Sequence, residues 1–169
     1  SEIFGNSNYK NRITEKSLKK PLSPYGMSKL IGYEIIKSYR SIYKIPVCTA
    51  ILFNHESPLR SKDFVFKKII DSAKKIKKDH KFKLKVGNIN IKRDWGWGPE
   101  YMEGCHQILN TKKIDDYIIA TEKTASLKQI IDFSFNKVNL NWKNHTIIDK
   151  KNFRKFEIDQ NYSSTRKLK

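Results

Sequence analysis

Apolar residues along the chain recur with two spacings, one typical of helices and one typical of buried strands. Four segments repeat them every three or four positions and are predicted to be helices: 24–43, 63–78, 99–109 and 126–138. Three short runs rich in β-branched and aromatic residues are predicted to be strands: 45–53, 117–120 and 145–148. An interrupted run over 82–91 is predicted to be a hairpin around Gly87-Asn88. Residues 6–23 and 153–159 are predicted to be loop or extended chain.

Local signals support two of these helices. Ser23 is a typical N-cap residue, and Pro24 fits the first turn of the helix that follows. The second helix is amphipathic, with Phe64, Ile69 and Ile76 on its predicted buried face and lysines on the solvated face.

The alternation of strands and helices favours an α/β fold with mostly parallel strand pairing. A doubly wound fold that binds a dinucleotide should carry a glycine-rich turn after its first strand. The seven glycines form neither GxGxxG nor GxxGxxG. Either the fold binds no nucleotide, or its first half lies outside this sequence. The chain begins at Ser1 without a methionine and stops within 164–169, so we expect a fragment.

Composition narrows the class of protein. The 169 residues suffice for one ordinary domain, and the apolar fraction of 38% favours a folded chain. No membrane-spanning run or signal peptide is evident, and Cys48 and Cys105 form no CxxC pair, so we expect a cytoplasmic protein. The four histidines are scattered, and no metal site is predicted.

The net charge of +18 is compatible with a basic module that binds nucleic acid. However, only six of the 35 basic residues are arginines, the residue that reads base edges by paired hydrogen bonds. Lysine, isoleucine and asparagine have AT-rich codons, so genome composition also accounts for this bias. A nucleic-acid partner is therefore kept as an alternative.

The first candidate for chemistry is the spacing Tyr25-x-x-x-Lys29, which places both side chains on one helix face. An ammonium beside a phenol stabilises the deprotonated form, which could then take a proton from a sugar hydroxyl. Taken alone, the pair is more typical of two amphipathic side chains on a helix surface.

Further motifs give the pair a context. FNHESP at residues 53–58 and KRDWG at residues 92–96 are far more specific than YxxxK. With them the chain resembles the extended short-chain dehydrogenases/reductases, and among these the GDP-mannose 4,6-dehydratase family. The resemblance runs in the family's order through these segments: 1–5, 23–29, 51–60, 64–68, 87–88, 92–96, 116–121 and 153–159.

The resemblance implies a fold and a reaction. Residues 1–60 would be the C-terminal part of a Rossmann-type dinucleotide-binding domain, and 61–169 mostly a smaller substrate-binding region. The complete family enzyme dehydrates GDP-mannose with NADP and forms oligomers; the fragment alone need not be active. Tyr25 would be the base at the sugar C4 hydroxyl, and Lys29 would hold the nicotinamide ribose. Glu2 would remove the C5 proton and assist loss of the C6 hydroxyl.

The resemblance also assigns binding residues. Four residues match positions that contact the cofactor: Tyr25, Lys29, His55 and Arg60. Five residues match positions lining the GDP-sugar site: Asn54, Lys68, Arg93, Arg154 and Glu157. Cations suit a diphosphate.

Some family features differ or lie outside the sequence. A catalytic threonine that precedes the Ser-Glu pair falls one position before Ser1. The RPxEVD motif appears at 154–159 without its proline, and SPRRG appears at 57–61 with one arginine and the glycine replaced. Another nucleotide-sugar epimerase, dehydratase or reductase therefore stays an alternative, although Glu2 favours dehydration because a simple epimerase needs no C5 base.

Overall fold

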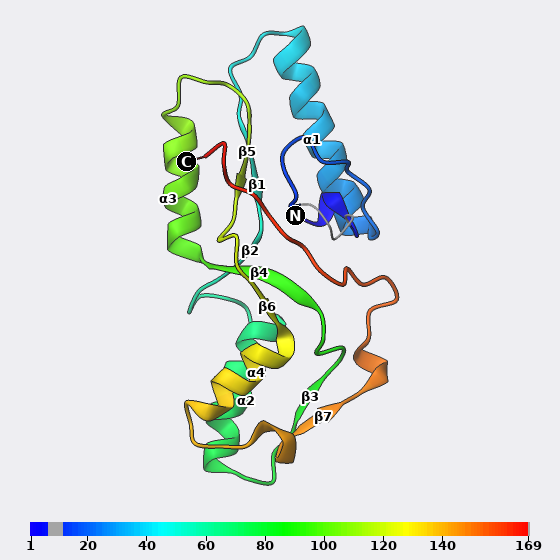
Figure 1. The fold of residues 1–169 in the computed structure, drawn as a ribbon, viewed down its shortest axis with the longest axis vertical. Coiled ribbons are helices and arrows are strands. Elements are labelled where there is room, and N and C mark those ends of the chain that lie inside the picture. Colours follow the sequence, from blue (N-terminus) through cyan, green and yellow to red (C-terminus); the bar gives the residue numbers. More distant parts are fainter. Residues whose placement is uncertain (7–11, 169) are drawn as a thin grey trace.

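The computed structural model describes residues 1–6 and 12–168, which form an elongated molecule with two lobes (Figure 1). The first lobe contains η1 (Glu2–Phe4), α1 (Pro24–Ile42), β1 (Thr49–Leu52), α3 (Gly98–Leu109) and β5 (Asp116–Ile119). The second contains α2 (Val65–Lys78), β3 (Leu84–Val86), α4 (Leu127–Asn136), η2 (Trp142–Asn144), β7 (Thr146–Ile148) and η3 (Lys150–Asn152). Between them lie β2 (Asn54–Glu56), β4 (Lys92–Trp97) and β6 (Thr124–Ser126). We call these three strands the junction sheet.

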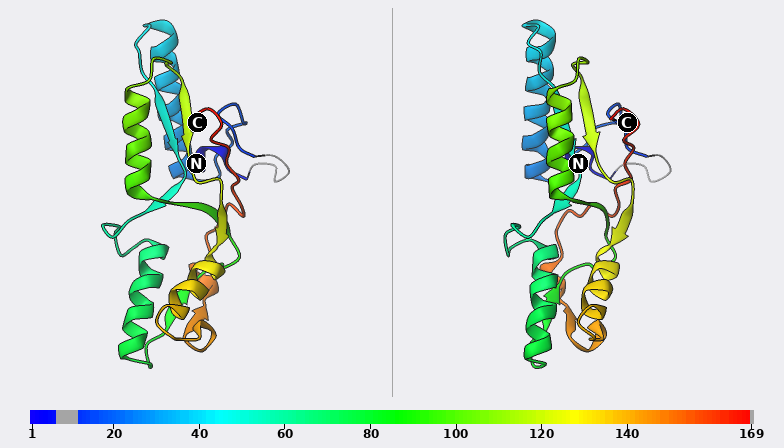
Figure 2. Two further views of the ribbon diagram at one scale, coloured as in Figure 1. Left: turned by 60° about the vertical axis from the view of Figure 1, so that its left-hand side comes forward. Right: turned by 90° about the vertical axis from the view of Figure 1, so that its left-hand side faces the viewer.

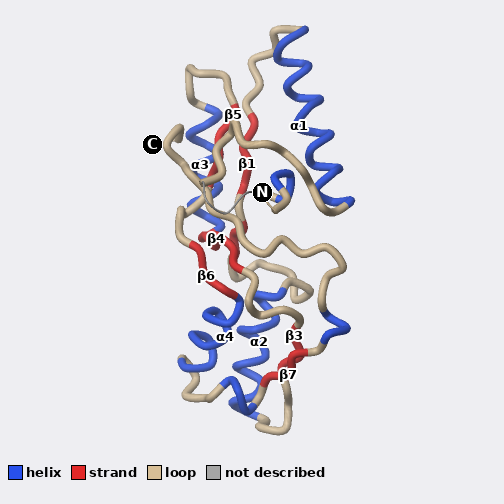
Figure 3. The backbone as a smooth tube through the Cα atoms, turned by 45° about the vertical axis from the view of Figure 1, so that its right-hand side comes forward, coloured by secondary structure: helices blue, strands red, loops and turns tan. Residues whose placement is uncertain are grey.

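Strand pairing is mostly parallel, as the sequence predicts. β1 pairs with β5, β2 with β4 and β3 with β7, all in parallel, while β4 and β6 are antiparallel. In the first lobe, α1 and α3 lie on opposite sides of β1 and β5 (Figure 1). Figure 3 shows the three sets of paired strands one after another along the long axis of the molecule, with helices beside them.

The helix ends follow from local sequence. The Ser23 hydroxyl accepts a hydrogen bond from the Gly26 amide (3.0 Å), and Pro24 occupies the first turn of α1. A capping box starts α4, where Ser126 and Gln129 satisfy each other's backbone amides. α1 therefore begins at the predicted residue, and α4 begins one residue later than predicted, at Leu127, and ends at Asn136.

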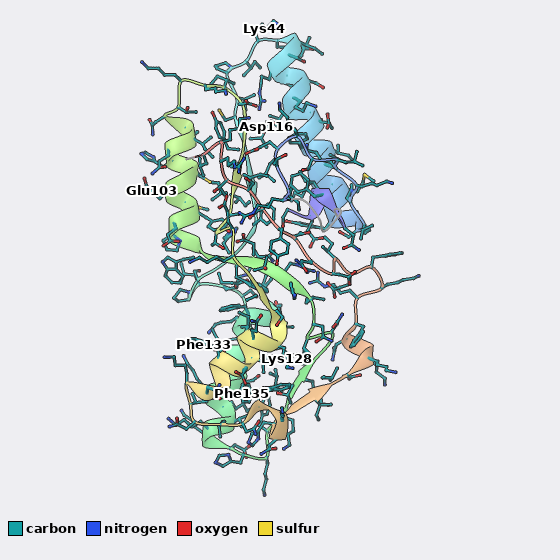
Figure 4. All side chains as sticks on the ribbon, in the orientation of Figure 1. Lys44, Glu103, Asp116, Lys128, Phe133 and Phe135 are labelled. Carbon is teal, nitrogen blue, oxygen red and sulfur yellow. The ribbon has the colours of Figure 1, made fainter. Side chains whose placement is uncertain are left out.

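Each lobe has its own apolar core. The first core gathers residues from η1, α1, β1, α3 and β5, including Phe4, Ile51 and Ile118. The second core forms where α2 packs on α4 and includes Ile69 and Phe135, both fully buried. Phe133, two residues earlier on α4, is 64% exposed (Figure 4). The alternation follows from the helical period.

A buried polar cluster ties α1 to β5. Asp116 is the first residue of β5 (Figure 4). Its carboxylate accepts hydrogen bonds from the Tyr33 hydroxyl (2.7 Å) and Arg40 Nη2 (2.7 Å) of α1. Burial would raise the pKa of Asp116, but these hydrogen bonds and the Arg40 charge outweigh it and hold the pKa below its usual value. The orientation of α1 on the sheet is therefore fixed by charge as well as by apolar packing.

The C-terminal segment connects the two lobes. After η3 it runs from the second lobe back along the junction sheet to the first lobe, as three views agree (Figures 1 and 2). Bridges join Gln160 to Lys92 and Ser163 to Ile13. No helix within the described ranges is long and apolar enough to cross a membrane.

The predicted hairpin around Gly87-Asn88 is wrong. β3 pairs in parallel with β7, and Val86 accepts a hydrogen bond from the Asp149 amide (2.8 Å) instead of turning back on the next run. A Cβ atom at Gly87 would meet the Asn152 carbonyl group, so the glycine serves a close approach of two chain segments. Pairing between residues distant in sequence overrides the local turn signal.

Three smaller expectations also differ from the structure. The strand predicted over 45–53 is confined to β1, and α2 begins at Val65, leaving Phe64 46% exposed outside the buried face. β2, β4 and β6 were not predicted. β2 consists of three polar residues, charged and glycine residues interrupt the apolar pattern of β4, and β6 has only three residues.

Candidate functional site

The segment that carries Glu2 packs against the start of α1. The Ser23 hydroxyl donates a hydrogen bond to the Glu2 carboxylate (Oγ to Oε2 3.5 Å) while accepting one from the Gly26 amide. Gly26 is buried, and a Cβ atom there would lie 2.9 Å from the Glu2 carbonyl oxygen. A side chain at this position would push the two segments apart. Ser23 and Gly26 therefore set the position of Glu2 relative to the helix.

Tyr25 and Lys29 lie on the first turns of the same helix. The Lys29 ammonium is 5.5 Å from the centroid of the Tyr25 ring, as the four-residue spacing predicts. Tyr25 is 61% exposed, so its hydroxyl is accessible to a ligand.

Arg93 of β4 forms an ion pair with Glu157 of the C-terminal segment. Arg93 Nη2 lies 3.0 Å from Glu157 Oε1, and the two side chains are 6% and 17% exposed. Burial lowers the pKa of Arg93, against the opposing charge of Glu157. Burial likewise raises the pKa of Glu157, although Arg93 and Arg154 oppose this. Burial thus disfavours the charged form of both partners more than their pairing favours it.

Glu2 is close enough to this ion pair to act on it. After the dominant effect of burial, the charge of Glu2 contributes to the pKa of both Arg93 and Glu157. Asn6 joins the two segments, because its side chain donates to the Glu157 carbonyl (3.3 Å) and accepts from the Asp159 amide (2.9 Å). The segment that carries the candidate catalytic carboxylate therefore lies beside the segment of Glu157, which is more than 90 positions away in sequence.

Asn54 and His55 lie on β2, the strand that pairs with β4 and hence with the strand of Arg93. His55 Nδ1 is 3.0 Å from the Phe53 carbonyl oxygen. Because a carbonyl oxygen can only accept, Nδ1 carries a proton, and Nε2 is the acceptor of the neutral ring. The hydrogen bond thus defines Nε2 as the nitrogen of His55 that can accept a proton or a hydrogen bond.

Arg60 is held from two sides. Its Nε lies 3.3 Å from Glu56 Oε2, and its guanidinium carbon lies 3.5 Å from the centroid of the Phe64 ring. Glu56 is buried, and this burial raises its pKa against the opposing charge of Arg60. The guanidinium is therefore fixed in orientation, which suits recognition of a phosphate.

Two of the sequence-predicted binding residues are less constrained. Arg154 is exposed and interacts electrostatically with Arg93 and Glu157. Lys68 is exposed on α2, and its side chain forms no hydrogen bond or ion pair with the part of the chain that the structure describes. The geometry therefore groups Arg154, but not Lys68, with the ion pair.

A sequence model of the GDP-mannose 4,6 dehydratase family matches residues 1–169. The chain belongs to this family. The resemblance carried by the FNHESP and KRDWG segments is thereby confirmed.

Individual members of the GDP-mannose 4,6 dehydratase family are also similar to the chain in sequence. The chain is 42% identical over 159 residues to GDP-mannose 4,6 dehydratase 1 of Arabidopsis thaliana, a match that covers 94% of this chain and 44% of the relative. It is 37% identical over 169 residues to GDP-mannose 4,6 dehydratase 2 of the same plant, covering 100% of this chain and 45% of that relative. The chain therefore spans less than half the length of these curated relatives.

Solved structures establish the fold. A dTDP-glucose 4,6-dehydratase from Bacillus anthracis in complex with NAD aligns with a TM-score of 0.86 at 18% identity, covering 99% of this chain and 51% of that one. RMD from Pseudomonas aeruginosa complexed with NADPH also aligns with a TM-score of 0.86 at 18% identity, covering 99% and 55%. The predicted class, α/β and part of a doubly wound Rossmann-type fold, is confirmed.

Sequence reasoning missed several residues of this candidate site. Asp94 is fully buried and accepts hydrogen bonds from the Thr121 amide (2.9 Å), the Thr121 hydroxyl (2.7 Å) and the Ser163 hydroxyl (2.8 Å). Glu56 supports Arg60, and Ser23 supports Glu2. Asp94 and Glu56 lie inside the two most specific motifs, which is the signal that could have found them.

Proposed function

We propose that this chain takes part in the NADP-dependent dehydration of GDP-D-mannose to GDP-4-dehydro-6-deoxy-D-mannose, a lyase reaction. The observation that carries the proposal is the setting of Glu2, whose carboxylate accepts a hydrogen bond from Ser23 at the start of α1 and whose charge acts on the ion pair of Arg93 and Glu157. A base for C5 is what dehydration needs and a simple epimerisation does not. Membership of the GDP-mannose 4,6 dehydratase family supports this choice.

The chain's residues fit a nicotinamide dinucleotide. Lys29 offers an exposed ammonium to ribose hydroxyls, Arg60 a fixed guanidinium to a phosphate, and His55 a ring of defined tautomer. When bound, NADP would accept a hydride from C4 of the sugar and later return it to C6, so it would not be consumed. The choice of NADP over NAD stays a prediction, because one structural neighbour contains NADPH and another NAD.

Tyr25 would take the proton of the C4 hydroxyl. Its exposed hydroxyl can reach a sugar, and Lys29 on the same helix face would stabilise the negative charge that develops on its oxygen. Lys29 would therefore have two roles, one towards Tyr25 and one towards the ribose.

Glu2 would act next, because oxidation of C4 to a ketone makes the C5 proton acidic. Its carboxylate would remove that proton and deliver one to the departing C6 hydroxyl, which leaves as water. One group can serve both steps because a carboxylate becomes a carboxylic acid after the first. The hydrogen bond from Ser23 would orient it for both.

The GDP moiety would lie near the Arg93 and Glu157 pair, with Arg154 nearby and Asn54 on the adjacent strand. A diphosphate would give Arg93 a second anionic partner. Lys68 stays a predicted contact to the same ligand. We propose that residues 1–60 serve the cofactor and 61–169 mostly the sugar nucleotide, with α3 and β5 returning to the first core.

We further propose a homo-oligomer. Apolar side chains are exposed along α1, where Met27, Ile31, Ile35 and Tyr39 line a groove of about 460 Å³. A second copy would cover this surface. The cytoplasmic location stays a prediction.

Mass spectrometry of the sugar nucleotide tests the reaction. GDP-mannose and NADP are incubated with the chain alone and with the chain extended by the coding sequence upstream of Ser1. Loss of one water from the sugar nucleotide is expected in the extended form. Absence of water loss in both forms contradicts the proposed substrate and directs the test to other nucleotide sugars.

Glu2→Gln in the active form tests the assignment of the base. Turnover should fall by about 10²–10⁴-fold while cofactor affinity is unchanged, because the amide cannot take a proton. Glu103→Gln, on an exposed part of α3, is the matched control (Figure 4). Normal turnover of the Glu2→Gln variant would exclude Glu2 as the base.

A further inference from the structure

A glycine lies opposite His55 in the junction sheet. In the parallel pairing of β2 with β4, His55 is in register with Gly96. A Cβ atom at Gly96 would lie 2.8 Å from both Cζ and the hydroxyl oxygen of Tyr101, and closer still to Cε2. No side chain can therefore be accommodated there while Tyr101 keeps its position. The absence of a side chain at this register position opens a gap in the sheet surface.

The ring of Tyr101, from α3, fills that gap and reaches His55. The two ring centroids are 4.8 Å apart, with an interplanar angle of 33°. This separation is in the range of offset-stacked aromatic pairs. Tyr101 is only 2% exposed, so its ring has little freedom to leave. The His55 ring is thus held by the Phe53 carbonyl at Nδ1 and by Tyr101 on one face.

The phenol group itself is not used for this contact. Within the described residues, the buried Tyr101 hydroxyl has no hydrogen-bond partner. Burial, followed by the nearby charge of Asp94, raises the pKa of Tyr101, which keeps the phenol neutral. The contact to His55 is therefore made by the ring.

We propose that Tyr101 is a positioning residue for His55, and that Gly96 is required because it admits the Tyr101 ring between α3 and β2. The ring restricts His55 to the orientation in which Nδ1 donates to Phe53 and Nε2 is the acceptor. The consequence for cofactor binding rests on the proposed function, in which His55 contacts the nicotinamide dinucleotide. The orientation of His55 does not depend on that assignment.

The orientation is tested by NMR of the His55 ring in this chain, which needs no cofactor. Tyr101→Leu should shift the ring proton resonances of His55, because the ring current is lost, and should mix its two tautomers. Gly96→Ala should have the same effect by displacing Tyr101. Tyr101→Phe should retain the wild-type spectrum, since only the unused hydroxyl is removed.

Tyr117→Leu is the matched control. Tyr117 belongs to the same core as Tyr101 and is 5% exposed. It lies on β5, and its hydroxyl donates a hydrogen bond to the Lys113 carbonyl. Its replacement should leave the His55 resonances in place. A His55 spectrum unchanged by Tyr101→Leu, or changed equally by Tyr117→Leu, would overturn the proposal. A Tyr101→Phe spectrum like that of Tyr101→Leu would overturn the role of the ring.

NADPH titration of the same variants then separates this proposal from the proposed function. If both hold, Tyr101→Leu should weaken NADPH binding by about two- to tenfold, the scale of one aromatic contact, and Tyr101→Phe should restore it. A changed His55 spectrum with unchanged NADPH affinity supports the positioning by Tyr101 and contradicts the cofactor role of His55.

Discussion

The start of α1 and the junction sheet hold their functional groups in opposite ways. Tyr25 and Lys29 are exposed, adjacent on one helix and held by few contacts. Arg93 and Asp94 are buried, and each bonds a segment distant in sequence. Groups that exchange protons with a substrate have to be reachable, whereas groups that orient it gain from being fixed. Substitutions at the start of α1 should therefore reduce activity, whereas substitutions in the junction sheet should reduce stability.

Tyr25→Phe should produce the largest change in activity with no change in stability. Turnover of GDP-mannose by the active form should fall by about 10²–10⁴-fold, because the proposed proton acceptor is removed. The free energy of unfolding should stay within about 0.5 kcal/mol of wild type, as for other exposed sites. Steady-state kinetics and urea unfolding measure the two effects. A large loss of stability would remove the contrast with the junction sheet.

Glu157→Leu should destabilise the chain by about 3 kcal/mol, because it leaves the buried charge of Arg93 without its partner. The double variant Arg93→Met/Glu157→Leu should recover most of that stability, since burial disfavours both charged forms. Urea unfolding of the single and double variants gives the comparison. A double variant as unstable as the single one would show that the ion pair itself stabilises the fold. Neither variant should bind GDP-mannose.

Asp94→Asn should cost about 2 kcal/mol, because charge-assisted hydrogen bonds from Thr121 and Ser163 are weakened while the shape is kept. Asp132→Asn on the exposed face of α4 is the control and should be neutral. Thermal unfolding measures both. Equal stability of the two variants would mean that Asp94 does not hold the C-terminal segment.

The pH dependence of Glu157 gives a smaller effect with a defined sign. Burial raises the pKa of Glu157 in the folded state. Its contribution to the free energy of unfolding is therefore fully present below the ordinary pKa of 4.5, and it is lost as pH rises through the raised pKa of the folded state. The stability of wild type relative to Glu157→Gln should therefore decrease from pH 4 upwards. Calorimetric unfolding at several pH values checks this. If the stability of wild type relative to Glu157→Gln increases with pH, the pKa of Glu157 is not raised in the folded state.

Ile35→Lys should have the smallest effect on the folding of one chain, within about 0.5 kcal/mol, because Ile35 is half exposed on α1. It should nevertheless dissociate the proposed oligomer by placing a charge in the apolar groove. Analytical ultracentrifugation distinguishes the two states. A mass that is unchanged from wild type would move the interface away from α1.

Local sequence predicted more of the exposed region than of the buried one. The four-residue spacing was enough to place Lys29 beside Tyr25, and Ser23 and Pro24 were enough to start α1. In contrast, β4 was not predicted, although its motif was identified. It consists of three charged residues followed by Trp-Gly-Trp, and the strand contacts both lobes and the C-terminal segment. A strand with such varied neighbours does not show the alternation of apolar and polar residues by which strands are recognised in a sequence.

The sequence alone determined the family, the fold class and the positions of the helices, because motifs, caps and helical periodicity act over a few residues. Only the tertiary structure decided that the segment of Glu2 packs against the segment of Glu157, and that Gly96 admits Tyr101 to His55. These contacts join segments separated by tens of residues. Their geometry depends on strand register and on how two cores pack around the junction sheet, which no local pattern encodes.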